Sequence, residues 1–169
     1  MRVYQRPVFL RLEFGHDDML DEYLSVWKKF AERRQAGGSL NIALVWESAS
    51  CEESNPADWY PGDEVVDWVG MSYCDGKPSE ATIQFAREHF KPVMMNASSN
   101  SMDWNEWFVP FFQFVKENND VIRAVTYLNA GKSRIDLNAD LLQKWKEETK
   151  ESFWLKASPK LFNELGFVE

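Results

Sequence analysis

The sequence lacks several features that identify common classes of protein. Its 169 residues contain only two cysteines, Cys51 and Cys74, which are too few for a disulfide framework. We expect both thiols to be reduced, although neighbouring strands could bring them close enough to pair. No apolar run approaches the roughly 20 residues that a membrane-spanning helix needs. The first ten residues are polar and unlike a signal peptide, so a cytoplasmic location is the default expectation.

Positive charge is also scarce. The chain has 19 Lys and Arg against 27 Asp and Glu, which gives a net charge of -8. This field repels phosphate backbones, and no basic cluster interrupts it, so we expect no nucleic-acid partner. The Gly-rich turns GxGxxG and GxxxxGK[ST] are absent, and no CxxC or HxxxH spacing indicates a metal site. We therefore expect neither a cofactor nor a metal.

Aromatic residues, by contrast, are abundant. Hydrophobic residues make up 44% of the chain and aromatic residues 15%, with eight Trp and twelve Phe. This composition predicts a large hydrophobic core, and it also suits sugar-binding surfaces, where flat rings pack on pyranose faces. The length fits one domain, so we expect residues 1–169 to form a single domain.

Segments of strand length alternate with segments of helical periodicity along the chain. The expected strands are 8–14, 41–46, 65–73, 93–97 and 121–129. The expected helices follow Asp17–Asp18, Ser79, Trp104 (with a bend at Pro110), the region around Leu141, and Ser158–Pro159. Such alternation predicts an α/β fold with a parallel sheet. Five strands cannot close a barrel of eight, so an open doubly wound sheet is the simplest architecture from the pattern alone.

Five segments occur in a particular order: RPVFLRLEFGHDD (6–18), NIALVWESAS (41–50), WYPGDEVVDWVGMSY (59–73), KPVMMNASS (91–99) and VIRAVTYLN (121–129). Their order and spacing resemble the β-mannanase-like glycoside hydrolases of family 26 and their uncharacterised bacterial relatives. The match of 59–73, with its YPGD turn and VDWVG strand, is the most specific. The resemblance implies strands four to eight of a (β/α)8 TIM-type barrel, that is, a partial barrel of about five parallel strands.

The same resemblance implies a chemistry whose two catalytic positions are occupied in this chain by residues that cannot perform it. Active members hydrolyse β-1,4-mannosidic or related bonds with retention, which needs two carboxyl groups about 5–5.5 Å apart. The resemblance places the acid/base Glu four residues after Arg11, where this chain has Gly15, and the nucleophile at Ala97. We therefore expect a degenerate domain that lacks both catalytic carboxylates and serves in carbohydrate binding or assembly.

Two other carboxylates could take over, so a second interpretation stays open. A weak or altered glycosidase acting on mannan- or glucan-type polysaccharide could use Glu47 with Glu13, or with a carboxylate from a partner chain. The simpler interpretation of Glu13 is a buried ion pair with Arg11, because buried charges need partners. The simpler interpretation of Glu47 is a solvated Glu at a loop edge.

Several residues at the expected carboxyl ends of the strands are candidates for substrate binding. They are Trp46, Tyr73, Asn129, His16 and Asp17. The carboxyl ends of barrel strands carry function, so these side chains could contact a sugar. The alternative is that the two aromatic rings cap the core, that Asp17 caps a helix and that His16 is a surface residue.

A partial barrel also leaves strand edges without neighbours. We therefore expect the chain to form a homo-oligomer or to bind a partner chain that completes the barrel, with an oligo- or polysaccharide as its ligand.

Overall fold

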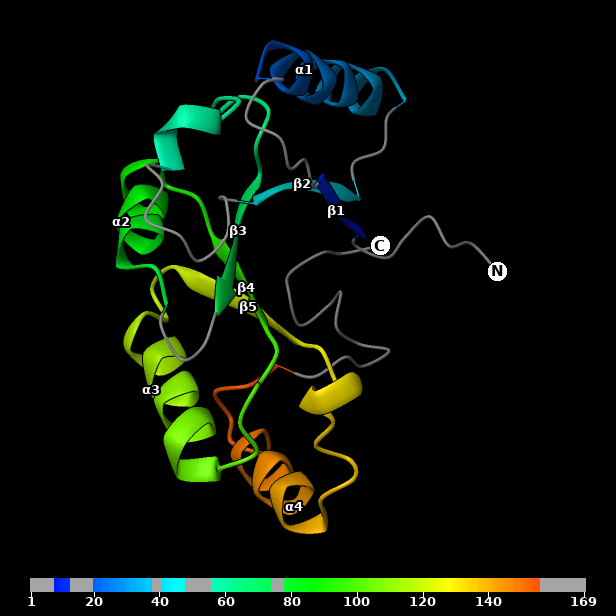
Figure 1. Cartoon of the computed structure of the whole chain (residues 1–169). Coiled ribbons are helices and arrows are strands. Elements are labelled where there is room, and N and C mark those ends of the chain that lie inside the picture. The colour runs from blue at the N-terminus through cyan, green and yellow to red at the C-terminus, as the bar shows by residue number, and fades with distance from the viewer. Residues whose placement is uncertain (1–7, 13–19, 38–40, 48–55, 74–77, 156–169) are drawn as a thin grey trace.

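The computed structural model describes residues 8–12, 20–37, 41–47, 56–73 and 78–155 (Figure 1). Five strands form one parallel sheet in sequential order: β1 (Val8–Leu12), β2 (Ile42–Glu47), β3 (Trp68–Tyr73), β4 (Val93–Ala97) and β5 (Ile122–Tyr127). The helices between and after them are α1 (Leu20–Ala36), α2 (Glu80–Glu88), α3 (Val109–Glu117) and α4 (Ala139–Glu148). Short helical turns lie at η2 (Pro56–Trp59), η3 (Trp104–Phe108) and η4 (Gly131–Ser133).

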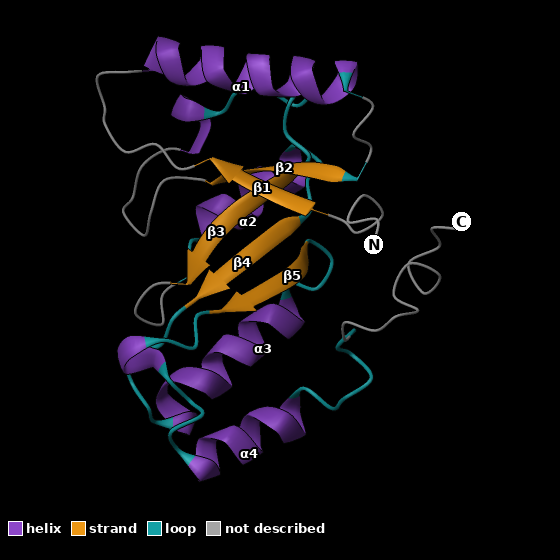
Figure 2. Cartoon of the chain, turned by 90° about the vertical axis from the view of Figure 1, so that its right-hand side faces the viewer, coloured by secondary structure: helices purple, strands orange, loops and turns teal. Residues whose placement is uncertain are grey.

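The sheet is curled, and the described helices lie around its convex side (Figures 1 and 2). A doubly wound sheet would instead reverse its strand order at a switch point and carry helices on both faces. The sequential order and the one-sided helices make the fold a partial TIM-type barrel, as the resemblance implied.

Alternate residues along each strand face the helices and form the core. On β3 these residues are Val69, Met71 and Tyr73, all of which are buried. The residues between them face the opposite side, because successive side chains of a strand alternate. We call this second side the inner face, and Figure 2 looks onto it. Its residues are Phe9, Arg11, Ala43, Val45, Glu47, Trp68, Gly70, Ser72, Met94, Asn96, Ala124 and Thr126.

The first turn after β4 differs from the expected bent α-helix. Residues Trp104–Phe108 form a π-helical turn, in which the N–H of Val109 donates to the carbonyl of Trp104. Pro110 has no N–H to donate to residue 106, so the α-helical ladder is interrupted there. The α-helical pattern begins only at Val109, and Pro110 lies in its first turn, where a missing N–H costs little.

Other boundaries follow local hydrogen bonds. Ser79 caps α2 as expected, because its Oγ accepts a hydrogen bond from the N–H of Thr82 at 3.2 Å. β3 begins three residues later than expected, since the N–H groups of Val65 and Val66 bond to the carbonyl of Gly62. The helix expected at Ser158–Pro159 lies outside the described residues. In the part of the chain that the structure describes, no helix is both long and apolar enough to cross a membrane.

Candidate functional site

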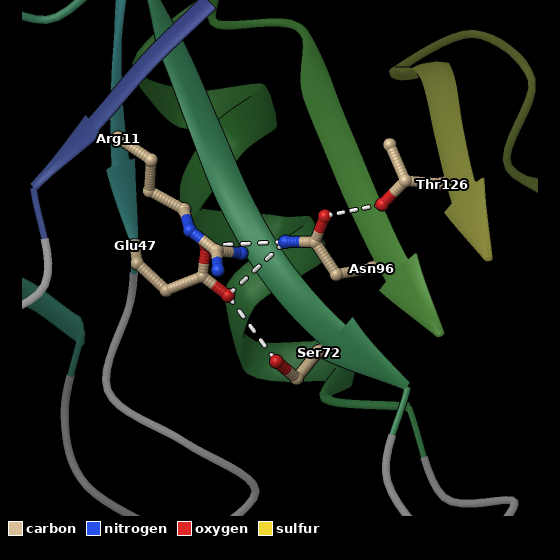
Figure 3. A network of polar contacts seen from close by, with 5 residues as sticks. All are labelled: Arg11, Glu47, Ser72, Asn96 and Thr126. Atoms are coloured by element: carbon tan, nitrogen blue, oxygen red, sulfur yellow. Dashed lines mark hydrogen bonds and ion pairs between the residues drawn. The ribbon is translucent and has the colours of Figure 1, made fainter. Parts of the chain in front are cut away.

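One polar side chain from each strand contributes to a chain of contacts across the inner face (Figure 3). Arg11 Nη1 lies 3.3 Å from Glu47 Oε2, and Ser72 Oγ donates to Glu47 Oε1 at 3.2 Å. Asn96 Nδ2 donates to both carboxylate oxygens of Glu47, at 3.4 and 3.3 Å. Thr126 Oγ1 donates in turn to Asn96 Oδ1 at 2.6 Å. We call these five residues the polar row.

Strand register explains why the row forms. Ser72 lies opposite Asn96, and Asn96 lies opposite Thr126, so three side chains of β3, β4 and β5 stand side by side. Glu47 lies opposite Gly70, which has no side chain to block the path from β2 across β3. The carboxylate therefore reaches Asn96 although β2 and β4 are not adjacent.

Glu47 carries the negative charge of the row. It is the only acidic residue in the five described strands. Its side chain is 15% exposed, which corrects the expectation of a solvated Glu at a loop edge. A carboxylate this buried needs a counter-charge and hydrogen-bond donors, and Arg11, Ser72 and Asn96 provide them. The described partner of Arg11 is thus Glu47, whereas Glu13 lies outside the described residues.

An aromatic pair lies next to the polar row on the same face. The rings of Phe9 and Trp68 meet edge to face, with centroids 5.1 Å apart and planes at 82°. They meet across β2, where the inner-face residues Ala43 and Val45 are small or medium in size. The Phe9 side chain remains 42% exposed. The inner face therefore combines an accessible apolar ring with a charged, hydrogen-bonding row.

The two aromatic rings expected to contact substrate lie on the other side of the sheet. Trp46 is fully buried and contacts Tyr60 and Phe85, and Tyr73 packs against Trp107. Burial also raises the pKa of the Tyr73 hydroxyl. Both rings are core side chains in this fold, as the alternative interpretation held, and we do not include them in the candidate site.

Ala97, the position that the resemblance gives to the nucleophile, also belongs to the helix-facing core. It is buried at the end of β4, next to the inner-face residue Asn96. The methyl group of Ala97 is thus directed away from the polar row. The polar side chain that β4 contributes to the inner face is an amide.

Asn129 follows β5 and is engaged in a loop. Its Oδ1 accepts a hydrogen bond from the N–H of Ile135 at 2.8 Å, and its side chain also hydrogen-bonds Asp136. Arg134 forms two hydrogen bonds with Asp136, at 3.0 and 2.6 Å. Mainly because of Arg134, the pKa of Asp136 is lowered to about 2. Asn129 therefore orders the loop after β5 rather than joining the polar row.

The remaining expected site residues cannot be placed. His16 and Asp17 lie outside the described residues, as do Gly15, Cys51 and Cys74. Within the described part of the chain, no group of three or more His, Cys, Asp or Glu is arranged to hold a metal ion.

Sequence reasoning missed most of the polar row. Ser72, Asn96 and Thr126 were not among the expected site residues, although Ser72 and Asn96 are polar residues inside otherwise apolar strands. That position was the available signal, because a polar residue in a buried strand needs a partner. Gly70 was missed for a related reason: its importance depends on Glu47, which belongs to another strand.

Comparisons with known proteins agree with this architecture. No family model matches the chain. In sequence it is 30% identical to the β-1,3-xylanase TXYA of a Vibrio species, over 97% of this chain and 48% of the relative. It is 29% identical to a β-1,3-xylanase of an Alcaligenes species, over 96% of this chain and 47% of the relative. The chain thus spans about half the length of these curated relatives.

The fold is also similar to a solved structure. The family 26 β-mannanase of Bacteroides ovatus superposes with a TM-score of 0.62 at 17% identity, over 89% of this chain and 52% of that one. At this identity the likeness concerns the fold. The chain therefore has the fold of the C-terminal strands, four to eight, of a β-mannanase-like family 26 glycoside hydrolase barrel.

Proposed function

We propose that this chain binds a β-linked oligo- or polysaccharide on its inner face and does not cleave it. The observation that supports this most directly is the state of Glu47. It is the only acidic residue in the five described strands, and its carboxylate is engaged by Arg11, Ser72 and Asn96. Retaining hydrolysis needs a second carboxyl group about 5–5.5 Å away. The two positions that the resemblance gives to catalytic carboxylates hold Gly15 and Ala97.

The inner face has the chemistry that a neutral sugar needs. The carboxylate of Glu47 can accept hydrogen bonds from sugar hydroxyls. The amide of Asn96 and the hydroxyl of Thr126 can both accept and donate them. The exposed Phe9 ring offers an apolar surface for the C–H face of a pyranose. Because relatives of the chain are named β-1,3-xylanases and a β-mannanase, xylan- and mannan-type saccharides are the first ligands to test.

Calorimetry together with product analysis tests the proposal. The chain is titrated with β-1,3-xylo-, β-1,4-manno- and β-1,4-gluco-oligosaccharides, and the mixtures are then separated by chromatography. We expect saturable binding of at least one series and no shorter products. Asn96→Ala removes a central hydrogen-bonding side chain and should weaken binding about tenfold, the equivalent of about 1.4 kcal/mol.

Two matched substitutions distinguish binding from catalysis. Glu47→Gln and Glu117→Gln each replace a carboxylate by an amide, but Glu117 is exposed on α3, where it bonds Gln113. Products that vanish with Glu47→Gln and persist with Glu117→Gln would instead support a glycosidase that uses Glu47 with Glu13 or a partner-chain carboxylate. The proposal would be overturned if the chain showed no binding of any of the three series and formed no products from them.

A further inference from the structure

An open hollow of about 390 Å³ lies at the amino ends of β4 and β5. It is bordered by the turn that leads from α2 into β4 and by the turn that leads from α3 into β5. The two turns are joined where the N–H of Val93 donates to the carbonyl of Val121 at 2.8 Å. Asn96 and Thr126 lie toward the other ends of the same strands, so the hollow is separate from the polar row. Its volume is within the range of small-molecule sites.

Phe90 borders the hollow in a conformation that is unfavourable for a side chain. Its backbone has φ +54, in the left-handed region, and its ring is 93% exposed. The ring therefore goes with backbone strain and has little packing to offset it. Pro92 and Val121 continue the apolar surface from this ring into the hollow. Strained positions are concentrated at ligand-binding sites, and here the strain places an aromatic ring beside a hollow of ligand size.

Three cationic side chains border the same hollow, and one of them is neutralised there. Arg87 donates to both carboxylate oxygens of Asp120, at 2.9 and 3.0 Å. Lys91 and Arg123 donate to backbone carbonyls, at 2.8 and 3.3 Å, and among the described residues neither has a carboxylate within ion-pair distance. Three cations and one carboxylate give the hollow a net charge of +2, although the whole chain carries -8. The hollow is therefore complementary to an anion.

The side chains that remain available to a ligand are hydrogen-bond donors. Lysine and arginine have no acceptor atom, and the oxygens of Asp120 are engaged by Arg87. The carboxylate of Asp63, whose carbonyl accepts from Lys91, is bonded to Tyr60 and His89. A neutral sugar has hydroxyls that donate as well as accept, so it matches this surface poorly. A long polyanion is opposed by the net charge of the chain, whereas a single carboxylate attached to an apolar ring matches both the donors and Phe90.

We propose that this hollow is a binding site for an aromatic carboxylate, with Lys91 and Arg123 as hydrogen-bond donors and Phe90 as the contact for the aromatic ring. Hydrogen bonds between a cation and a carboxylate are stronger than neutral ones, and paired aromatic rings add attraction beyond the area that they bury. Arg87 has a positioning role, because its bonds to Asp120 and to Asn118 Oδ1 hold the two turns together. The carboxylate is either a free acid or part of a polypeptide, and both sources share this chemistry.

The probes are phenylacetate, its uncharged amide phenylacetamide, and inorganic phosphate, each titrated into the isotope-labelled chain and followed by NMR. We expect saturable shifts of the amide signals of Phe90, Lys91 and Arg123 with phenylacetate, in the millimolar range usual for so small a ligand. Phenylacetamide lacks the charge and phosphate lacks the ring, so each should bind roughly fivefold more weakly. A blocked dipeptide of phenylalanine and aspartate distinguishes the sources. Tighter binding of the dipeptide than of phenylacetate would assign the carboxylate to a polypeptide, and the reverse order would assign it to a free acid.

Substitutions separate the ring from the charges. Phe90→Ala removes the ring, and Arg123→Gln or Lys91→Gln removes one charge, so each should weaken phenylacetate binding about fivefold. Lys132→Gln is the matched control, because it removes a charge from an exposed side chain on η4, which follows the carboxyl end of β5. This variant should bind phenylacetate as the unsubstituted chain does. Circular dichroism should show that all four variants are folded.

Three results would overturn the inference. The first is no saturable shift with phenylacetate or with the dipeptide, and the second is equal binding of phenylacetate and phenylacetamide. The third is phenylacetate binding that persists unchanged in both Phe90→Ala and Arg123→Gln. Saccharide binding is measured on the same variants and should be unaffected, because the hollow and the polar row lie at opposite ends of the strands. A failure here is therefore distinguishable from a failure of the proposed function.

Discussion

Gly70 on β3 lies opposite Glu47 on β2, and a Cβ atom at position 70 would be only 2.3 Å from Glu47 Oε2. The carboxylate occupies the space that any other residue at position 70 would fill. This arrangement lets one charged group on β2 contact Ser72 on β3 and Asn96 on β4. The polar row therefore depends on a residue that contributes no polar atom of its own side chain.

Gly70→Ala should displace the Glu47 carboxylate from Ser72 and Asn96. We expect the free energy of unfolding to fall by about 1–3 kcal/mol, as for other overpacked sites, and saccharide affinity to fall with it. Urea denaturation and calorimetry measure the two effects. The double variant Gly70→Ala/Glu47→Ala should lose less stability than the sum of the single variants, because the clash is gone. Strictly additive losses of stability would show that the added methyl group does not act through a clash with Glu47.

Phe90→Gly should stabilise the chain by roughly 1 kcal/mol. Phe90 follows α2 with φ +54, and its N–H and that of Lys91 bond back to the carbonyls of Arg87 and Ala86. This is the C-terminal motif in which glycine is preferred, since a side chain is strained at positive φ. The Phe90 ring is 93% exposed, so little packing is lost with it. Thermal or urea unfolding should show the gain.

Phe90→Ala serves as the control for this substitution. It removes the ring but keeps the Cβ atom, so it should leave stability nearly unchanged. A loss of stability in Phe90→Gly would mean that the ring contributes more than its exposure indicates.

The carboxyl group of Asp136 should titrate near pH 2, well below its usual value of 3.8, mainly because of Arg134. Arg134→Gln should return the pKa toward 3.8, and Asn129→Ala should raise it less. Since the folded-state pKa is lowered, the stabilisation is present above pH 3.8 and is lost as the pH falls toward 2. NMR titration of the side-chain carboxyl carbon measures the shift. An unchanged midpoint in Arg134→Gln would show that the ion pair is not its cause.

The fold was largely predictable from the sequence because strand and helix periods are local. The apolar run at 93–97 predicted β4 without error, and Ser79 marked the start of α2. The choice between an open sheet and a partial barrel depended on the resemblance, since strand order is not encoded in any single segment. The π-helical turn before Pro110 could not be specified, because the ladder can reorganise in several ways around a proline.

The site was much less predictable than the fold. Apart from Glu47 and Ser72, β2 and β3 are apolar on both faces, so the sequence pattern does not show which way Trp46 and Tyr73 point. Both rings proved to be in the core. The partners of Glu47 are also remote in sequence: Ser72 is 25 residues away and Asn96 is 49 residues away. Only the three-dimensional register brings them together.

A crystal structure of the chain with a bound β-1,3-xylo- or β-1,4-manno-oligosaccharide would examine non-catalytic binding most directly. We predict an intact saccharide over the inner face, with hydroxyl groups hydrogen-bonded to Asn96 and Thr126 and one ring against Phe9. A cleaved saccharide, a sugar covalently bound to a carboxylate, or a ligand bound only outside the inner face would contradict this prediction.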